Sequence, residues 1–207
     1  MVDVVTDTRL RIIEAARTRL LADGYAGLST RKVAEEAGVP LSQLHYHFGS
    51  KGGLIIALFS EENNRLLERQ TEMYAQDMPL WQRYEQACDF LEDDLESGYV
   101  RVLQEMLAAG WSNPEIGNVD RDQLSRWFVL LADVAREAER RFGALGPFTP
   151  EEIATLVANA FIGSEALLLL GFERPVMPIR SALRRIGVII REREEAAGAV
   201  GAPIVAG

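Results

Sequence analysis

The chain has 207 residues, of which 22 are Lys or Arg and 31 are Asp or Glu, and its formal net charge is −9. This length suits one well-buried domain or a small module joined to a larger one. The single cysteine, Cys88, excludes a disulfide framework and a thiolate metal cluster within the chain, so we expect a small buried apolar residue. The start, MVDVVTDT, lacks the basic and apolar stretches of a signal sequence, so we expect the protein in the cytoplasm.

The acidic charge is unevenly distributed. Residues 1–55 hold seven basic and six acidic side chains, whereas the remainder carries an excess of ten acidic ones. Binding to nucleic acid depends on where charge lies rather than on the total. The N-terminal part therefore remains a candidate for DNA binding, with a modest electrostatic attraction.

The first predicted element is a helix from about Thr8 to Asp23, ended by Gly24. Its inward stripe consists of Leu10, Ile13, Ala16 and Leu20. We expect this helix to brace the two short helices that follow.

The next stretch, Ser29 to Lys51, reads STRKVAEEAGVPLSQLHYHFGSK and predicts two short helices that meet at a tight turn. Apolar residues recur at helical spacing in each half: Val33, Ala34 and Ala37, then Leu41, Leu44 and Phe48. Gly38 lies at the corner, where it can adopt a positive φ. This pattern is typical of a helix-turn-helix.

The second of these helices has a predicted reading face. If Leu44 and Phe48 point inward, a rotation of about 100° per residue leaves Ser42, Gln43, His45 and Tyr46 on the opposite side. Ser and Gln side chains suit the edges of bases, whereas Tyr, His and Lys near the helix end suit phosphate oxygens. The predicted DNA-binding residues are Thr30, Arg31, Lys32, Ser42, Gln43, His45, Tyr46, His47 and Lys51.

Over roughly residues 8–60 the chain resembles the DNA-binding domain of the tetracycline-repressor (TetR) family of transcriptional regulators. The resemblance is carried by Ser29–Ala34, Ala37-Gly38-Val39, Leu44–Phe48 and Gly49-Ser50-Lys51. Pro40 stands where the family usually has a Ser or Thr cap, and His45 where it usually has Tyr. The resemblance implies a homodimer that binds a palindromic operator and commonly responds to a small ligand.

From Lys51 a helix is predicted to about Ala75. Gly52 and Gly53 weaken its start by about 1 kcal/mol each against Ala. This weak segment is interpreted either as a hinge between the helix-turn-helix and the rest of the chain or as a loose helix start, and the sequence leaves both interpretations open.

The remainder predicts an all-α fold of about nine helices: a three-helix helix-turn-helix domain at residues 1–52, a larger helical ligand-binding and dimerisation domain at 53–195, and a flexible tail at 196–207. Apolar stripes run through about residues 81–95, 99–107 and 120–142. The acidic run Glu92-Asp93-Asp94 is interpreted as a solvated face.

Two helices close the predicted fold. The first, from Thr149-Pro150 to about Leu170, is apolar on nearly every side; polar residues interrupt it, so we interpret it as a covered helix rather than a membrane span. The second, at about 178–195, has isoleucines and leucines at steps of four, three and four, the seam of a helix bundle. The predicted dimerisation residues are Phe161, Leu168, Ile179, Leu183, Ile186 and Ile190.

The larger domain also carries many aromatic residues, interpreted either as ordinary core or as the lining of a pocket for a mostly apolar molecule. The candidate ligand-binding residues are Trp81, Tyr84, Tyr99, Met106, Trp127, Phe128, Phe161 and Glu165. Glu165 lies amid leucines, so it is either ligand-directed or bonded in a dimer interface.

Nothing in the sequence predicts an enzyme, a metal or a cofactor. His45 and His47 point about 200° apart on a helix, so they cannot share a metal ion. We therefore expect a homodimeric transcriptional regulator, most simply a repressor, that binds double-stranded DNA and an unknown small effector, and no membrane. The alternative is a helical ligand- or partner-binding protein with little sequence-specific DNA binding.

Overall fold

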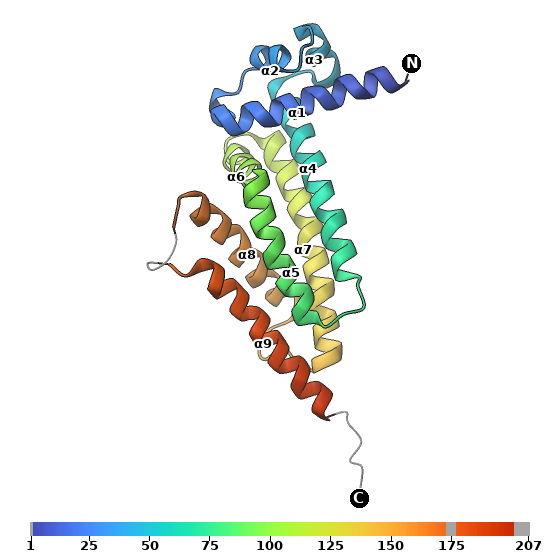
Figure 1. Cartoon of the computed structure of the whole chain (residues 1–207), viewed down its shortest axis with the longest axis vertical. Helices are drawn as coiled ribbons and strands as arrows, with labels where there is room; N and C mark the ends of the chain where they lie inside the picture. Colours follow the sequence, from blue (N-terminus) through green and yellow to red (C-terminus); the bar gives the residue numbers. More distant parts are fainter. Residues whose placement is uncertain (1, 173–176, 201–207) are drawn as a thin grey trace, which may run out of the picture. The chain divides into compact units, whose positions relative to one another are not determined.

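The computed structural model describes residues 2–172 and 177–200 and contains nine helices and no strand within them (Figure 1). This confirms the all-α prediction. The helices are α1 (Val2–Gly27), α2 (Thr30–Glu36), α3 (Leu41–Phe48), α4 (Lys51–Tyr74), α5 (Leu80–Ser97), α6 (Tyr99–Gly110), α7 (Pro114–Phe142), α8 (Pro150–Leu169) and α9 (Ile179–Val200).

The chain forms two compact units. Unit 1 comprises residues 1–66 and 97–124, and unit 2 comprises residues 67–96 and 125–207. Helices α4 and α7 each contribute residues to both units.

Unit 1 has a single apolar core to which α1, α2, α3, α4 and α6 all contribute. On α1 the fully buried side chains are Ile12, Ala16 and Leu20. The predicted inward stripe is wrong at its first position, because Leu10 is exposed and Ile12 fills the core in its place. The helix also runs beyond Asp23: Gly24 has a φ of 67° and produces a kink, after which the helix continues to Gly27.

Two other helix ends differ from prediction. Helix α7 begins at Pro114 rather than near Asp120, with the Asn113 side-chain oxygen accepting bonds from the N–H groups of Glu115 (3.0 Å) and Ile116 (3.4 Å). This Asn-Pro pair is an N-cap followed by an N1 proline. Helix α9 continues to Val200, past the predicted end at residue 195, since Ala196 and Ala197 favour helix. The rest of the predicted tail, 201–207, lies outside the described residues.

In unit 2, ion pairs join α5 to α9. Glu85, Asp89 and Glu92 recur at helical spacing on α5 and pair with three arginines of α9, namely Arg191, Arg184 and Arg180 respectively. Asp94 pairs in addition with Arg69 at 2.7 Å. The acidic run at 92–94 is therefore not simply a solvated face, because two of its three carboxylates bind arginines of other helices.

Helix α8 begins with the predicted cap. The Glu152 N–H donates to the Thr149 hydroxyl (3.2 Å), and the Thr149 N–H donates to the Glu152 carboxylate (2.8 Å). These reciprocal bonds form a capping box. By length and composition alone, α8 is the one helix within the described ranges that could cross a membrane.

Candidate DNA-binding helix and ligand pocket

The corner between α2 and α3 has the geometry that the sequence predicts. Gly38 has a φ of 63°, which confirms the predicted left-handed turn. The Arg11 guanidinium of α1 donates to the carbonyl oxygens of Ala37 (2.6 Å) and Gly38 (3.3 Å). Arginine therefore satisfies carbonyls that the end of α2 leaves without a helical partner.

Helix α3 is anchored by one face and exposed on the other. Leu44 is 0% exposed, and Phe48 packs partly buried against the same core. Ser42, Gln43, His45 and Tyr46 are exposed, with 78% of the Tyr46 surface accessible. This confirms the predicted inward and outward faces.

The two ends of α3 are held differently. Pro40 occupies the N-cap and makes no side-chain cap bond, although its carbonyl accepts a bond from the Gln43 N–H (2.9 Å). At the other end, His45 Nδ1 lies 2.9 Å from the carbonyl oxygen of Gly49. A carbonyl only accepts, so Nδ1 carries the proton and Nε2 is left for other partners.

Three cations among the predicted DNA-binding residues lie in different surroundings. Lys51 donates to the Tyr25 carbonyl (2.5 Å) and sits 4.5 Å from the centre of the Tyr25 ring, and burial lowers the pKa of Lys51. Lys32 pairs with Asp23 at 3.3 Å. Arg31 is exposed at the start of α2, beside the half-buried Thr30. Among the three, Arg31 is therefore the most available for an added partner.

The start of α4 lies close to the end of α3. A Cβ at Gly53 would lie 2.2 Å from the Phe48 carbonyl oxygen, whereas a Cβ at Gly52 would approach only the Ser50 hydroxyl at 3.6 Å. Gly53 therefore permits a close backbone approach that any other residue would disturb.

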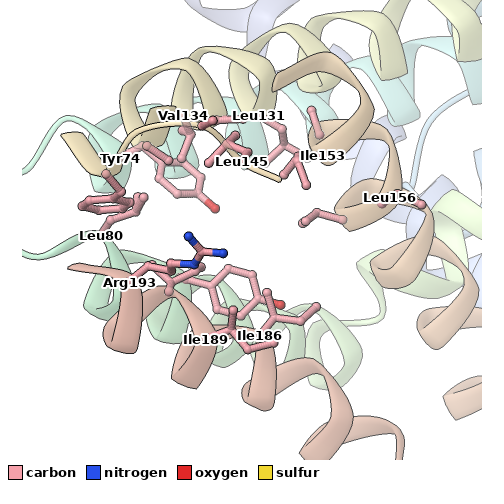
Figure 2. A pocket seen from close by; sticks show the side chains of 18 of the residues that line it. Tyr74, Leu80, Leu131, Val134, Leu145, Ile153, Leu156, Ile186, Ile189 and Arg193 are labelled. Carbon is pink, nitrogen blue, oxygen red and sulfur yellow. The ribbon is translucent and has the colours of Figure 1, made fainter. Parts of the chain in front are cut away.

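Unit 2 contains an apolar pocket with a volume of about 280 Å³ (Figure 2). Its walls come from α5, α7, α8 and α9, from Tyr74 at the end of α4, and from the segment that joins α7 to α8. The lining residues are Tyr74, Leu80, Tyr84, Leu131, Val134, Ala135, Ala138, Phe142, Gly143, Ala144, Leu145, Ile153, Ala154, Leu156, Val157, Ile186, Ile189, Ile190 and Arg193. Arg193 is the one charged residue in this set.

Of the eight candidate ligand-binding residues, Tyr84 lines the pocket. Tyr99 and Met106 are instead buried in the core of unit 1. Glu165 is buried within α8, and Phe161 lies edge-on to Tyr84 with ring centres 6.1 Å apart.

The tryptophans have partners of their own. The Arg191 guanidinium lies 3.8 Å from the centre of the Trp81 ring. Trp127 donates from its indole nitrogen to the Gln70 side-chain oxygen (2.7 Å), and Phe128 lies edge-on to the Trp127 ring. The pocket wall was missed because it is mostly aliphatic, and aliphatic helical stripes look alike whether they face a cavity or a filled core.

The tyrosine hydroxyls and the thiol in and beside the pocket are held in their neutral form by burial. Tyr84 donates from its hydroxyl to the Leu183 carbonyl (3.0 Å), and burial raises the pKa of both Tyr84 and Tyr74. Burial also raises the pKa of Cys88 to about 11, as expected for a buried thiol of low reactivity. Within the described ranges, no group of three His, Cys, Asp or Glu residues could hold a metal ion.

The predicted dimerisation residues lie mostly inside the protomer. Phe161, Ile179 and Leu183 are buried, Leu168 is half-buried, and Ile186 and Ile190 line the pocket. The large apolar side chains that α8, α9 and their flanks leave exposed are Phe148, Leu156, Leu169, Leu170, Phe172, Met177, Val188 and Ile189.

Comparison with known proteins agrees with the helix-turn-helix geometry. Residues 12–58 match the family described as bacterial regulatory proteins, tetR family. The chain is 35% identical over 66 residues to the HTH-type transcriptional repressor AcnR of Corynebacterium glutamicum, an alignment that covers 32% of this chain and 35% of that repressor. It is 24% identical over 149 residues to the HTH-type transcriptional regulator UidR of Escherichia coli, covering 68% and 70% of the two chains.

Solved structures share the fold over nearly the whole chain. The FadR regulator of Bacillus subtilis, in complex with stearoyl-CoA, aligns with a TM-score of 0.71 at 16% identity, over 87% of this chain and 96% of FadR. A TetR-family regulator from Agrobacterium tumefaciens aligns with a TM-score of 0.74 at 16% identity, over 91% and 98%.

An exposed polar helix face on a helix-turn-helix scaffold defines a DNA-binding protein of the regulator class. The match over residues 12–58 identifies this part of the chain as a helix-turn-helix domain of the TetR family, and the fold of solved TetR-family regulators extends over most of the chain.

Proposed function

We propose that this protein is a homodimeric transcriptional repressor that binds a near-palindromic operator and is released from it by a small apolar ligand. The observation that carries the proposal is the division of α3 into a buried face, anchored by Leu44, and an exposed polar face. A surface of this kind fits the major groove, which is wide enough to admit a helix.

Each exposed residue of α3 has a role in this proposal. Ser42, Gln43 and His45 contact base edges, and Tyr46 contacts phosphates together with the half-buried His47. Since His45 Nδ1 is bonded to the Gly49 carbonyl, Nε2 faces the DNA. Thr30 and Arg31 hold the backbone from α2. Lys51 and Lys32 contribute less, because each already has a partner within the domain.

Dimerisation uses the exposed apolar side chains of α8 and α9. Leu169 and Val188 project from these two helices, and Leu170 follows directly after α8. Exposed apolar patches of this kind mark interaction surfaces. Pairing of α8 and α9 with their copies in a four-helix interface also covers the apolar surface of α8 without a membrane.

Release of the operator by a ligand requires that the ligand bind better to a dimer in which the separation of the two α3 helices does not match the operator half-sites. The pocket of unit 2 is the proposed effector site, and FadR, which shares the fold, binds stearoyl-CoA. In this proposal residues 1–52 form the DNA-binding domain, residues 53–195 form the effector and dimerisation domain, and the protein acts in the cytoplasm.

Selection of bound duplexes from a random-sequence pool tests the proposal. We expect enrichment of a near-palindrome whose half-sites are centred about 34 Å apart or a multiple of that distance. A pool that stays random after repeated selection would favour the alternative, a helical binding protein with little sequence-specific affinity for DNA.

A further inference from the structure

The pocket of unit 2 combines a nearly uniform apolar wall with one cation. Eighteen of its nineteen lining residues are uncharged, and most are aliphatic. Arg193 of α9 is exposed and makes no ion pair within the described ranges, whereas Arg191 of the same helix pairs with Glu85, and Arg141 of α7 pairs with Glu137 and Glu194.

The charge lies at one end of the pocket. Figure 2 shows the Arg193 guanidinium projecting into the cavity, with Tyr74 and Leu80 at the same end and Leu156 at the far end. Leu131, Val134 and Ile153 form the wall between these ends on one side, and Ile186 and Ile189 form it on the other.

We propose that the pocket binds an unbranched aliphatic carboxylate of about eight to ten carbons, with the carboxylate on Arg193 and the chain directed toward Leu156. This inference rests on the proposed effector site and names the ligand class for it. An arginine fork matches a carboxylate in geometry and charge, and the apolar walls bind the aliphatic chain.

The size of the cavity sets the chain length. A water-sized group takes up about 30 Å³, so about 280 Å³ has room for roughly nine such groups. A carboxylate with seven to nine further carbons fills this space. Longer chains would have to leave the cavity or widen it.

The lining also favours carboxylate ligands over cationic ligands and neutral alcohols. No Asp or Glu lines the pocket, so a cationic ligand would have no counter-charge and would be repelled by Arg193. A neutral alcohol of equal length would gain the apolar contacts but no charge-assisted bond, which is worth about ten- to hundredfold in affinity.

Isothermal titration of the full chain with decanoate, decan-1-ol and decyltrimethylammonium tests the proposal. We expect decanoate to bind at least tenfold more tightly than the alcohol and the cation to bind most weakly. Affinity should rise about fourfold per methylene from hexanoate to decanoate and level off beyond it.

Arg193→Gln and Arg140→Gln form the matched pair of variants. Arg140 is an exposed arginine of α7 that does not line the pocket. We expect Arg193→Gln to weaken decanoate binding at least tenfold while changing the alcohol less than twofold, and Arg140→Gln to change neither. Equal affinities for decanoate and decanol, or equal losses of both in Arg193→Gln, would overturn the carboxylate assignment.

A parallel assay separates this inference from the proposed function. Wild-type protein that binds its selected duplex but no carboxylate would refute the ligand class and leave DNA binding standing. Protein that binds decanoate with the expected dependence on Arg193, yet keeps its DNA, would support the ligand class and refute release as its consequence.

Discussion

The hydroxyl of Tyr99 on α6 donates a hydrogen bond to the side-chain oxygen of Asn63 on α4, over 3.1 Å. The Asn63 amide donates in turn to the side-chain oxygen of Gln123 on α7, over 2.7 Å. All three side chains are buried. Because an unpaired buried polar group costs about 1–3 kcal/mol, these bonds fix the register of three helices within unit 1.

The first prediction concerns this buried hydrogen-bond relay, which consists of Tyr99, Asn63 and Gln123. Tyr99→Phe should lower the free energy of unfolding by about 1 kcal/mol, because it removes one bond to Asn63 and leaves the ring packing in place. Urea unfolding measures the loss. Tyr25→Phe is the control, since Tyr25 is half-buried and bonds through its backbone. Equal stability of Tyr99→Phe and wild type would show that the relay contributes nothing.

The crossing of α6 and α7 gives the second prediction. A Cβ at Gly117 would lie 2.8 Å from the carbonyl oxygen of Gly110, which is backbone and cannot rotate away. Gly117→Ala should therefore destabilise the protein by about 1–3 kcal/mol. Gly198→Ala, on the exposed side of α9 with nothing within 4 Å, should be neutral or up to about 1 kcal/mol stabilising. Thermal unfolding of both variants checks this, and a shift of the same sign in both would contradict the close crossing.

The third prediction concerns Asp120, a buried carboxylate of α7. Its Oδ1 has no hydrogen-bond partner among the described residues, and burial raises its pKa to about 6 from 3.8. The folded state therefore holds this proton more tightly than the unfolded chain does, so stability from this group increases as the pH falls through 6 toward 4.

Asp120→Asn should be more stable than wild type by about 1–2 kcal/mol at pH 7, with the difference shrinking by pH 5. Unfolding free energies at both pH values measure the change. Glu137 has the opposite effect on stability, because the bonded Arg83 lowers the pKa of Glu137. The stability that this ion pair contributes is lost only as the pH falls below the ordinary glutamate range. A difference that does not change with pH would mean that Asp120 does not titrate as described.

The fourth prediction concerns the proposed dimer. Leu170 is 74% exposed after α8 and Val188 is exposed on α9, so glutamate at both positions would place charge inside the proposed interface. We expect the double variant to sediment as a monomer at micromolar concentration and to bind operator weakly. Val129→Glu, at an exposed apolar residue of α7, should remain dimeric. A dimeric double variant would place the interface elsewhere.

The sequence predicted local geometry better than long-range contacts. Gly38 at the corner and Leu44 in the core follow from spacings within a few residues, and both agree with the structure. The start of α7 was also readable, since Asn113-Pro114 is itself a cap signal. The prediction missed it because it was based on the apolar stripe at about 120–142, although Ile116 is also buried in the core of unit 1.

The pocket and the dimer face could not be predicted in the same way. Periodicity shows that a helix face is buried, but not whether its own chain or a second copy covers it; Ile179 and Leu183 are covered by their own chain. Aromatic residues were also a poor guide to the pocket lining, because Trp81 contacts Arg191 rather than the cavity. The pocket brings Leu80 and Arg193 together, and no local pattern records a contact between residues so far apart in sequence.

The affinity of the selected duplex for a double variant of α3 measures how much the exposed face of this helix contributes to DNA binding. Gln43→Ala with Tyr46→Ala should weaken binding at least about thirtyfold, because each base or phosphate contact is worth roughly 1–3 kcal/mol. The control is Gln76→Ala with Trp111→Ala, which removes an exposed glutamine and an 87% exposed aromatic ring that do not belong to the helix-turn-helix. The control should keep wild-type affinity, and equal affinity of the α3 variant and wild type would rule out α3 as the DNA-binding surface.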